Sequence, residues 1–256
     1  MKQVPAGTKV DIDPETGAMK RLSGETRTNP YDLFALEAAL QLREKVGGSV
    51  TVLTMGPPQA EEMMRDAYTM GADDAVILSD RKFAGADVLA TSYALSQGIT
   101  AIGDIDLIIC GKQTTDGDTA QVGPAIAEHL GIPHAAWVSE IVDADSESIQ
   151  VKQDLVSVSQ TSKIPYPCLI TVDKDMCVTR LPSYLLQKQS KDRPVKIMTF
   201  EDMADQNLSK YGLVGSPTAV EKMFAPPEVE KQVYFDGDAK EKTKQLFDVL
   251  VNKKVI

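Results

Sequence analysis

Residues 111–123 have the sequence GKQTTDGDTAQVG, and the segments on either side of them indicate how the chain folds. An apolar run at 106–110 is interpreted as a buried parallel strand, and AQVGPAIAEHLG at 120–131 as a helix. A strand, a loop rich in Gly, Thr and Asp, and a helix N-terminus together suit a phosphate group. Small residues let backbone N–H groups approach the anion, and the helix dipole favours negative charge there. The pattern predicts an α/β fold with an anion-binding loop.

Two interpretations of this loop have equal weight on physical grounds. The loop matches neither GxGxxG nor GxxxxGK[ST], so it is neither a standard dinucleotide fingerprint nor a P-loop. If it binds phosphate, Lys112, Thr115, Thr119 and Gln121 could add side-chain donors. If it is an ordinary strand-to-helix turn, Thr119 acts only as the helix cap.

Apolar strands alternate with amphipathic helices in the first half of the chain. Helices are predicted at 30–46, 59–70 and 86–97, and strands at 49–55, 75–78 and 106–110. Asn29 suits the N-cap of the first helix, and Pro30 suits its first turn. The repeat predicts a doubly wound, mostly parallel sheet of the Rossmann-like, adenine-nucleotide-binding kind. Ligands then bind beyond the carboxyl ends of the strands, where the loops 55–57, 79–87 and 111–123 begin.

The second half of the chain has a different pattern. Strands predicted at 138–142, 148–158 and 168–172 are separated by turns, and we expect a small antiparallel section there. From about residue 188 the chain is polar and interrupted by prolines, and it ends in a predicted helix at 239–251. We therefore expect a nucleotide-binding domain at 1–190 and a C-terminal arm at 191–256. Such an arm is either a loosely packed extension or, as we favour, a segment that packs on another chain.

Composition excludes several functional classes. The chain has 256 residues and a formal net charge of −10, which argues against nucleic acid as a partner. The three cysteines form no CxxC pair, so no disulfide framework and no metal site is predicted. No stretch is as long and apolar as a membrane span, and no apolar signal region follows MKQVPAGTK. We expect a cytoplasmic protein without a membrane span.

Several motifs occur in one order along the chain. They are KQVP at 2–5, NPYD at 29–32, TMGPPQA at 54–60, MGADDAVIL at 70–78, FAGADVLATS at 83–92 and GKQTTDGDTAQVGP at 111–124. With these motifs the chain resembles the beta subunit of electron-transferring flavoproteins over nearly its whole length. The resemblance implies a heterodimer with an alpha subunit that carries an electron-shuttling FAD. It also implies an adenine nucleotide in the beta subunit.

The resemblance further implies which nucleotide is bound and what it does. Simple electron carriers of this family hold a structural AMP, whereas the bifurcating branch holds a second FAD that exchanges hydride with NAD(H). The DGDTAQVG and FAGADVLATS segments resemble the bifurcating branch, so we expect FAD rather than AMP. The chain would then serve an NAD- and ferredoxin-dependent oxidoreductase complex and have no catalytic residue of its own. One electron would go to ferredoxin and the other, through the alpha subunit, to an FAD-dependent dehydrogenase.

The dehydrogenase partner is inferred from two segments. LSDRKFAGADVLATSYALSQGI at 78–99 and TRLPSY at 179–184 resemble beta subunits that accompany lactate- or glycolate-type dehydrogenases. We therefore favour lactate, although acyl-CoA dehydrogenases are common partners in the family. The resemblance assigns partner docking to the loop 173–180, in which Met176 takes the anchor position; the alternative for this methionine is simple core packing.

The resemblance assigns three groups of cofactor-binding residues. The adenine and ribose region is assigned to Asn29, Pro30, Tyr31, Asp32 and Met55. The diphosphate region is assigned to Gly111, Lys112, Gln113, Thr114, Thr115, Asp116, Gly117, Asp118, Thr119, Ala120, Gln121 and Val122. The flavin side is assigned to Phe83, Ala84, Gly85, Ala86, Asp87 and Thr91. Three of these residues also have a purely structural explanation: Phe83 as a core aromatic, Thr91 as a helix residue bonded to its own backbone, and Asp32 as an acid in the first turn of a helix.

The start of the chain departs from the family pattern. The family has an apolar strand of about seven residues, an ordinary strand length, ahead of KQVP. Here Met1 directly precedes Lys2, so we expect a gap near the centre of the sheet. A non-redox nucleotide-binding protein of the universal-stress or ATP-pyrophosphatase type shares the predicted layout and is the rival interpretation, although its phosphate loops differ.

Overall fold

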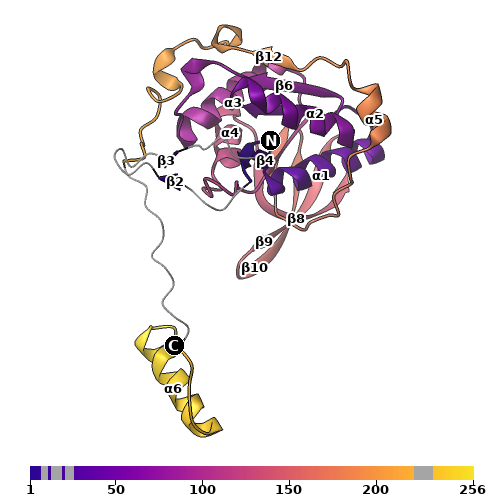
Figure 1. Ribbon diagram of the computed structural model, residues 1–256. Helices are drawn as coiled ribbons and strands as arrows, with labels where there is room; N and C mark the ends of the chain where they lie inside the picture. Colours follow the sequence, from indigo (N-terminus) through magenta and orange to yellow (C-terminus); the bar gives the residue numbers. More distant parts are fainter. Residues whose placement is uncertain (7–10, 13–18, 21–25, 222–232) are drawn as a thin grey trace.

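Parallel strands form the centre of the molecule, which a computed structural model describes at residues 1–6, 11–12, 19–20, 26–221 and 233–256 (Figure 1). One sheet has the strand order β12-β6-β5 and is parallel throughout. A second has the order β10-β9-β8-β11-β7, in which β7, β11 and β8 are parallel and β8, β9 and β10 antiparallel. The strands are β5 (Thr51–Met55), β6 (Asp74–Leu78), β7 (Leu107–Gly111), β8 (His134–Ala144), β9 (Ser148–Leu155), β10 (Val158–Pro165), β11 (Cys168–Val172) and β12 (Lys196–Met198).

Helices and short strands complete the described elements. The α-helices are α1 (Pro30–Val46), α2 (Glu61–Met70), α3 (Val88–Ile102), α4 (Val122–Leu130), α5 (Tyr184–Gln189) and α6 (Ala239–Asn252). The 3₁₀ turns are η1 (Pro58–Ala60), η2 (Arg81–Phe83), η3 (Phe200–Asp202) and η4 (Leu208–Lys210). Two antiparallel pairs join β1 (Gln3–Pro5) to β4 (Thr26–Thr28) and β2 (Asp11–Ile12) to β3 (Met19–Lys20).

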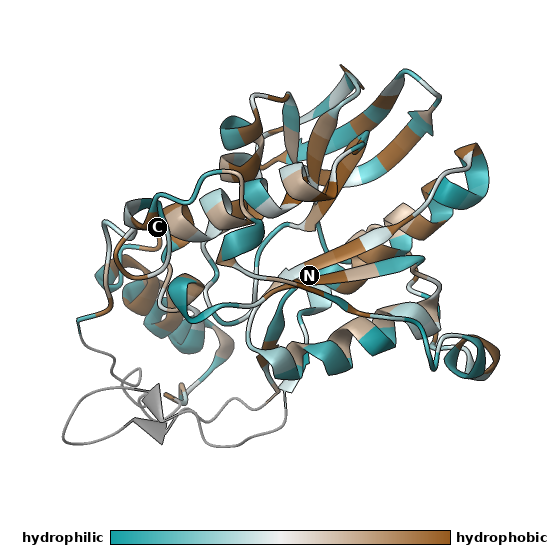
Figure 2. Cartoon of the chain, turned by 90° about the horizontal axis from the view of Figure 1, so that it is seen from above, coloured by the Kyte–Doolittle hydropathy of each residue, from teal (hydrophilic) through white to brown (hydrophobic). Residues whose placement is uncertain are grey.

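Helices cover both faces of the second sheet, as a doubly wound fold requires. Successive side chains of a strand point to opposite faces. Leu107 and Ile109 of β7 accordingly pack in the apolar cluster that includes Ala35 of α1, whereas Ile108 pairs with Ile126 of α4 in a different cluster. Figure 2 shows the apolar colouring concentrated on the strands and on parts of the helices. The predicted fold class is confirmed.

The predicted antiparallel section was wrong in two places. β11 lies between β7 and β8 and is parallel to both. All five of its residues are buried, as is typical of a central strand in a parallel sheet. The segment predicted as one strand at 148–158 turns at Val156 and Ser157 into a hairpin of β9 and β10. Val156 has φ +61°, a conformation that β-branched residues rarely adopt. Hairpin turns of this kind usually contain Gly, Asn or Asp, and because none stands at 156 or 157 the sequence did not indicate a turn there.

The body extends past residue 190. β12 pairs with β6, and Met198, Phe200, Met203 and Tyr211 are buried in one apolar cluster with Phe83. In Figure 1 the helix α6 lies apart from this body. Among the helices that the structure describes, none has both the length and the apolar composition needed to cross a bilayer.

Among the residues that the structure describes, no strand joins the two larger sheets. β5 and β7 are each the last strand of their own sheet, so each has one edge without a strand partner among the described residues. The terminal ammonium of Met1 donates to the Leu53 carbonyl of β5 at 2.6 Å.

Candidate functional site

The loop between β7 and α4 ends at a helix N-terminus that has no side-chain cap among the described residues. β7 ends at Gly111, and α4 begins at Val122 with Gln121 as its N-cap residue. Thr119 therefore does not cap the helix, as an ordinary turn would require. The first N–H groups of a helix have no intrahelical partner and carry the positive end of the dipole, so this terminus can bind an anion.

Two residues of the loop backbone, Asp118 and Ala120, adopt the left-handed conformation, each with φ +53°. Left-handed residues that alternate with right-handed ones can form a concavity of backbone N–H groups, called a nest, that binds anions. Gly123 lets the helix approach β11, because a Cβ atom at this position would lie 2.5 Å from the Thr171 methyl group. The combination fits a phosphate group held by backbone amides.

Asn29 fixes the loop from the far side of the site. Its side chain is fully buried, and its amide Nδ2 donates to the Gln113 carbonyl at 2.9 Å. Its Oδ1 accepts from the Thr115 N–H at 3.3 Å. Asn29 was predicted as the helix cap of α1 and as an adenine-side residue, but it makes no side-chain cap bond to that helix. Its side chain holds the loop 111–123, called the phosphate loop below after its predicted ligand. The assignment of Asn29 to the adenine side stays a prediction.

Lys2 also joins the N-terminal segment to the loop. Its N–H donates to Asp32 Oδ2 at 2.7 Å, and its ammonium pairs with Asp116 at 2.8 Å. Burial raises the pKa of Asp116, but the hydrogen bonds from Lys2 and Thr114 outweigh this, so the pKa lies below its ordinary value. Lys2 was not predicted as a site residue, because 114 positions separate it from its partner. The KQVP motif was its only signal.

Residues 29–32 of the predicted adenine group therefore lie beside the predicted diphosphate group. A Cβ atom at Gly111 would lie 2.5 Å from Asp32 Oδ1 and 2.7 Å from Tyr31 Cβ, so α1 and the loop are in close contact. Pro30 is the first residue of α1. Met55 is the last residue of β5 and is half-buried against the cluster that contains Leu78.

The predicted flavin-side residues contact a different part of the chain. Phe83 is 4% exposed and packs against Tyr211, whereas Ala84 and Gly85 are exposed. The Ala84 carbonyl accepts from the Leu213 N–H at 3.0 Å. Ala86 is half-buried, and the Thr91 N–H donates to the Asp87 carbonyl at 2.9 Å. The described hydrogen bonds of this group thus lead to residues 213–218 and not to the phosphate loop.

Asp87 is a structural link in that group. Its carboxylate accepts from the Ala90 N–H at 3.1 Å, which caps α3, and from the Thr218 hydroxyl at 2.7 Å. Burial raises the pKa of Asp87, but the bonds from Thr218 and the helix N–H groups lower it more, so it lies below its ordinary value. The assignment of this group to a flavin stays a prediction.

Several side chains of the phosphate loop bond to one another or to residues outside the loop. Gln113 bonds to Asp118, and the Gly117 N–H donates to the Thr114 hydroxyl at 3.3 Å. The Lys112 ammonium pairs with Asp173 at 2.9 Å. Thr115, Thr119 and Gln121 are exposed.

The predicted anchor Met176 is half-buried. It packs against the core cluster that contains Val172 and Ile170. Val178, two residues further along the same segment, is 89% exposed. Core packing therefore occupies at least part of the Met176 side chain, and its role in docking stays a prediction.

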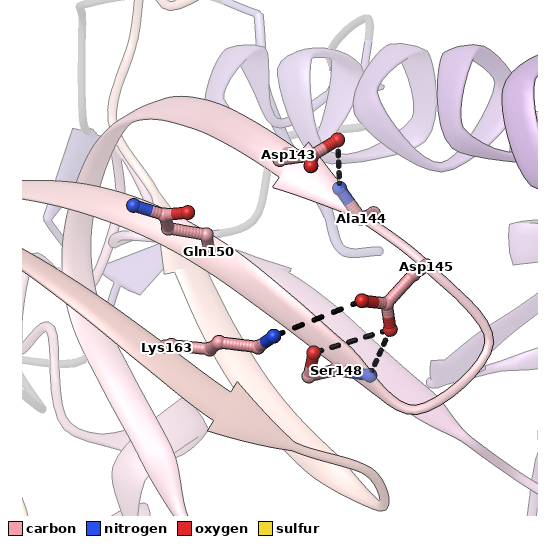
Figure 3. Close-up of a pocket in the computed structure, with 6 residues that line it drawn as sticks. All are labelled: Asp143, Ala144, Asp145, Ser148, Gln150 and Lys163. Carbon is pink, nitrogen blue, oxygen red and sulfur yellow. Dashed lines mark hydrogen bonds and ion pairs between the residues drawn. The ribbon is translucent and has the colours of Figure 1, made fainter.

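Two cavities lie elsewhere. One, of about 20 Å³, lies beside the turn between β8 and β9 and has room for about one water molecule. Figure 3 shows the residues that line it, among which Asp145 bonds to Ser148 and Lys163. A larger one, of about 220 Å³, is lined by Tyr68, Arg43 and Arg193 among others. Both guanidinium groups already donate to carbonyl groups that follow α2. Neither cavity touches the phosphate loop.

Comparison with known proteins agrees with this geometry. The family described as "Electron transfer flavoprotein domain" matches residues 16–203. Protein FixA of Bradyrhizobium diazoefficiens is 42% identical over 98% of this chain and 89% of its own length. The electron transfer flavoprotein subunit beta of Thermoanaerobacterium thermosaccharolyticum is 42% identical over 100% of this chain and 98% of its own. The acryloyl-CoA reductase electron transfer subunit gamma of Anaerotignum propionicum is 40% identical over the same shares. The chain therefore belongs to the electron transfer flavoprotein beta-subunit family.

Proposed function

We propose that the chain binds the diphosphate of FAD in the loop 111–123 and serves as the beta subunit of an electron-bifurcating complex. The observation that carries the proposal is the uncapped N-terminus of α4 beneath a loop with two left-handed residues. Backbone N–H groups would contact the phosphates there, because both loop carboxylates already have partners in Lys2 and Gln113. The adenine and ribose would lie toward residues 29–32.

The residues present fit such a nucleotide. Gly111 and Gly123 have no side chain, and this brings α1, β11 and the helix N-terminus close around the loop. Asn29 and Lys2 fix the loop shape in advance, which lowers the ordering cost of binding. When bound, FAD would supply hydride exchange with NAD(H) and one-electron transfer, while the chain supplies orientation and electrostatics.

The proposed partners follow from the family and from the C-terminal arm. Beta subunits of this family pair with an alpha subunit, and we place the contact on residues 191–256. Leu246 and Phe247 of α6 are 47% and 56% exposed, so this helix has apolar side chains that a partner chain could cover. Ferredoxin and an FAD-dependent dehydrogenase acting on lactate complete the proposed assembly, the latter from the resemblance at 78–99 and 179–184.

The bound nucleotide tests the proposal directly. The chain is purified together with its alpha subunit, denatured, and the released nucleotides are identified by chromatography and visible absorbance. Two FAD per heterodimer is the expected result. One FAD and one AMP would instead identify a non-bifurcating electron carrier, and ATP in a colourless preparation would favour the rival non-redox class.

Activity tests the finer assignment. The complete complex should oxidise lactate with NAD only when reduced ferredoxin is supplied. Equal lactate oxidation without ferredoxin would contradict bifurcation. Activity with an acyl-CoA in place of lactate would contradict the choice of substrate but not the bifurcating role.

A further inference from the structure

Lys112, the second residue of the phosphate loop, contacts the predicted docking segment, residues 173–180. Its N–H donates to the Val172 carbonyl at 2.8 Å, which places it beside the end of β11. Its ammonium pairs with Asp173, the first residue of the docking segment, at 2.9 Å. The same ammonium lies 4.4 Å from the ring centroid of Trp137. One cation of the phosphate loop therefore contacts the docking segment through an ion pair and β8 through an aromatic face.

The position of Trp137 depends on an unusual backbone conformation. Trp137 has φ +62°, which bulky residues rarely adopt, and its N–H donates to the Thr171 hydroxyl at 3.0 Å. The pairing of β8 with β11 shifts register between Ile170 and Val172 at the same place. Strain that the surrounding structure maintains is often found at functional positions. Here it is associated with the packing of the indole against Lys112.

The docking segment is fixed at its other end as well. Arg180 binds both oxygens of Glu37, at 2.9 and 3.1 Å, and Glu44 at 2.8 Å. Between the two ends, the Cys177 thiol contacts the Phe34 carbonyl at 3.9 Å. The Glu37 pair is the stronger anchor, because the Glu37 side chain is only 4% exposed. The pair of Lys112 and Asp173, 19% and 32% exposed, is the weaker one.

We infer that Lys112 couples nucleotide binding to the docking segment, an inference that rests on the proposed nucleotide site. A phosphate dianion in the loop attracts the ammonium and competes with the carboxylate of Asp173 for it. A weak, partly exposed ion pair can be broken in this way, whereas the anchor at Arg180 persists. Nucleotide binding therefore releases the first residue of the docking segment and moves a cation away from Trp137.

Trp137 is the only tryptophan of the chain, so its fluorescence reports this movement. The purified full chain is titrated with AMP and ADP, since a flavin would quench the indole by energy transfer. Affinity is measured separately by calorimetry. In the heterodimer, the spectrum of a Trp137→Phe variant is subtracted to remove emission from the alpha subunit. We expect a saturable emission change whose midpoint equals the calorimetric dissociation constant.

Two variants and their matched controls identify the coupling residues. Lys112→Met and Asp173→Asn should abolish the emission change. Lys174→Met and Asp175→Asn, which alter exposed neighbours in the same segment, should retain it. Asn tolerates the left-handed backbone at Asp175, where φ is +64°, so that control should fold normally.

A second readout follows the docking segment itself. Cys177 alkylation, quantified by mass spectrometry, should become about two- to fivefold faster when AMP is bound, as expected for the loss of one weak ion pair. The Lys112→Met variant should show no such acceleration. Calorimetric binding of AMP without any change in Trp137 emission, or a Lys112→Met variant that retains the full change, overturns the coupling but leaves the nucleotide site standing. Absence of nucleotide binding in the calorimeter overturns the proposed site together with the coupling.

Discussion

Replacement of Asn29 by alanine tests whether a buried amide shapes the phosphate loop. Asn29 has no exposed surface, and its side chain bonds to the backbone of two loop residues, Gln113 and Thr115. Alanine removes both bonds and leaves a small cavity. Asn29→Asp is the matched variant, because it retains the acceptor for Thr115 but places a carboxylate oxygen against the Gln113 carbonyl.

The expected loss of stability follows from the two distances. The bond to Gln113 is 2.9 Å long and should contribute about 1 kcal/mol, whereas the bond to Thr115, at 3.3 Å, should contribute about half as much. The Gln113 carbonyl is half-buried, so its desolvation without a partner adds about 1 kcal/mol. We expect Asn29→Ala to lower the free energy of unfolding by about 2–3 kcal/mol. Asn29→Asp should lose a similar amount, because of repulsion at Gln113.

Two assays separate stability from binding. Urea denaturation followed by circular dichroism gives the free energy of unfolding, and an unchanged m-value shows that the folded state is otherwise intact. Calorimetry with AMP should show about tenfold weaker binding, because part of the lost energy must be supplied again to order the loop. A loss below about 0.5 kcal/mol together with unchanged affinity would refute the role assigned to this amide.

Two further changes test other parts of the structure. Gly123→Ala should lower the free energy of unfolding, measured by urea denaturation, by about 1–3 kcal/mol, because the new Cβ atom would lie 2.5 Å from the methyl group of Thr171 in β11. Gly117→Ala is the control: its Cβ atom would lie 3.4 Å from the Thr114 hydroxyl oxygen, so the free energy of unfolding should change by less than about 0.5 kcal/mol. Burial raises the pKa of Glu37, but the bonds from Arg180 lower it more, so the pKa lies below 4.5. Glu37→Gln should therefore lower the free energy of unfolding by about 2–4 kcal/mol at pH 7. This loss should shrink as the pH falls below 4.5 toward the lowered pKa, because the carboxylate of the unmodified chain then becomes protonated. Equal costs at pH 7 and pH 3 would contradict that sign.

Local signals predicted most elements of the fold. α1 begins at Pro30 and ends before Gly47, as its proline and glycines indicated, and α6 lies within one residue of the prediction. α3 runs to Ile102 instead of 97, because Gly98 does not end the helix. A Cβ atom at Gly98 would lie 2.6 Å from the Leu78 side chain, so the close contact of α3 with β6 requires glycine inside the helix.

Elements fixed by distant partners were beyond such signals. β12 is a three-residue strand in a polar stretch, and only its pairing with β6 makes it a strand. The side chain of Lys112 was predicted as a phosphate donor from its place in the loop. Its preference for Asp173 depends on a strand end 61 residues away, which no local pattern contains.

The same reasoning explains why the phosphate loop matched no standard motif. Gly-rich fingerprints fix a loop by the conformations that their own glycines allow. In this loop, two non-glycine residues, Asp118 and Ala120, adopt the left-handed conformation. The side chains that fix the loop are distant in sequence: Asn29 bonds to its backbone, and Lys2 neutralises Asp116. Because the proposed anion-binding groups are backbone amides, substitutions that preserve these two tethers should change affinity less than substitutions of the tethers themselves.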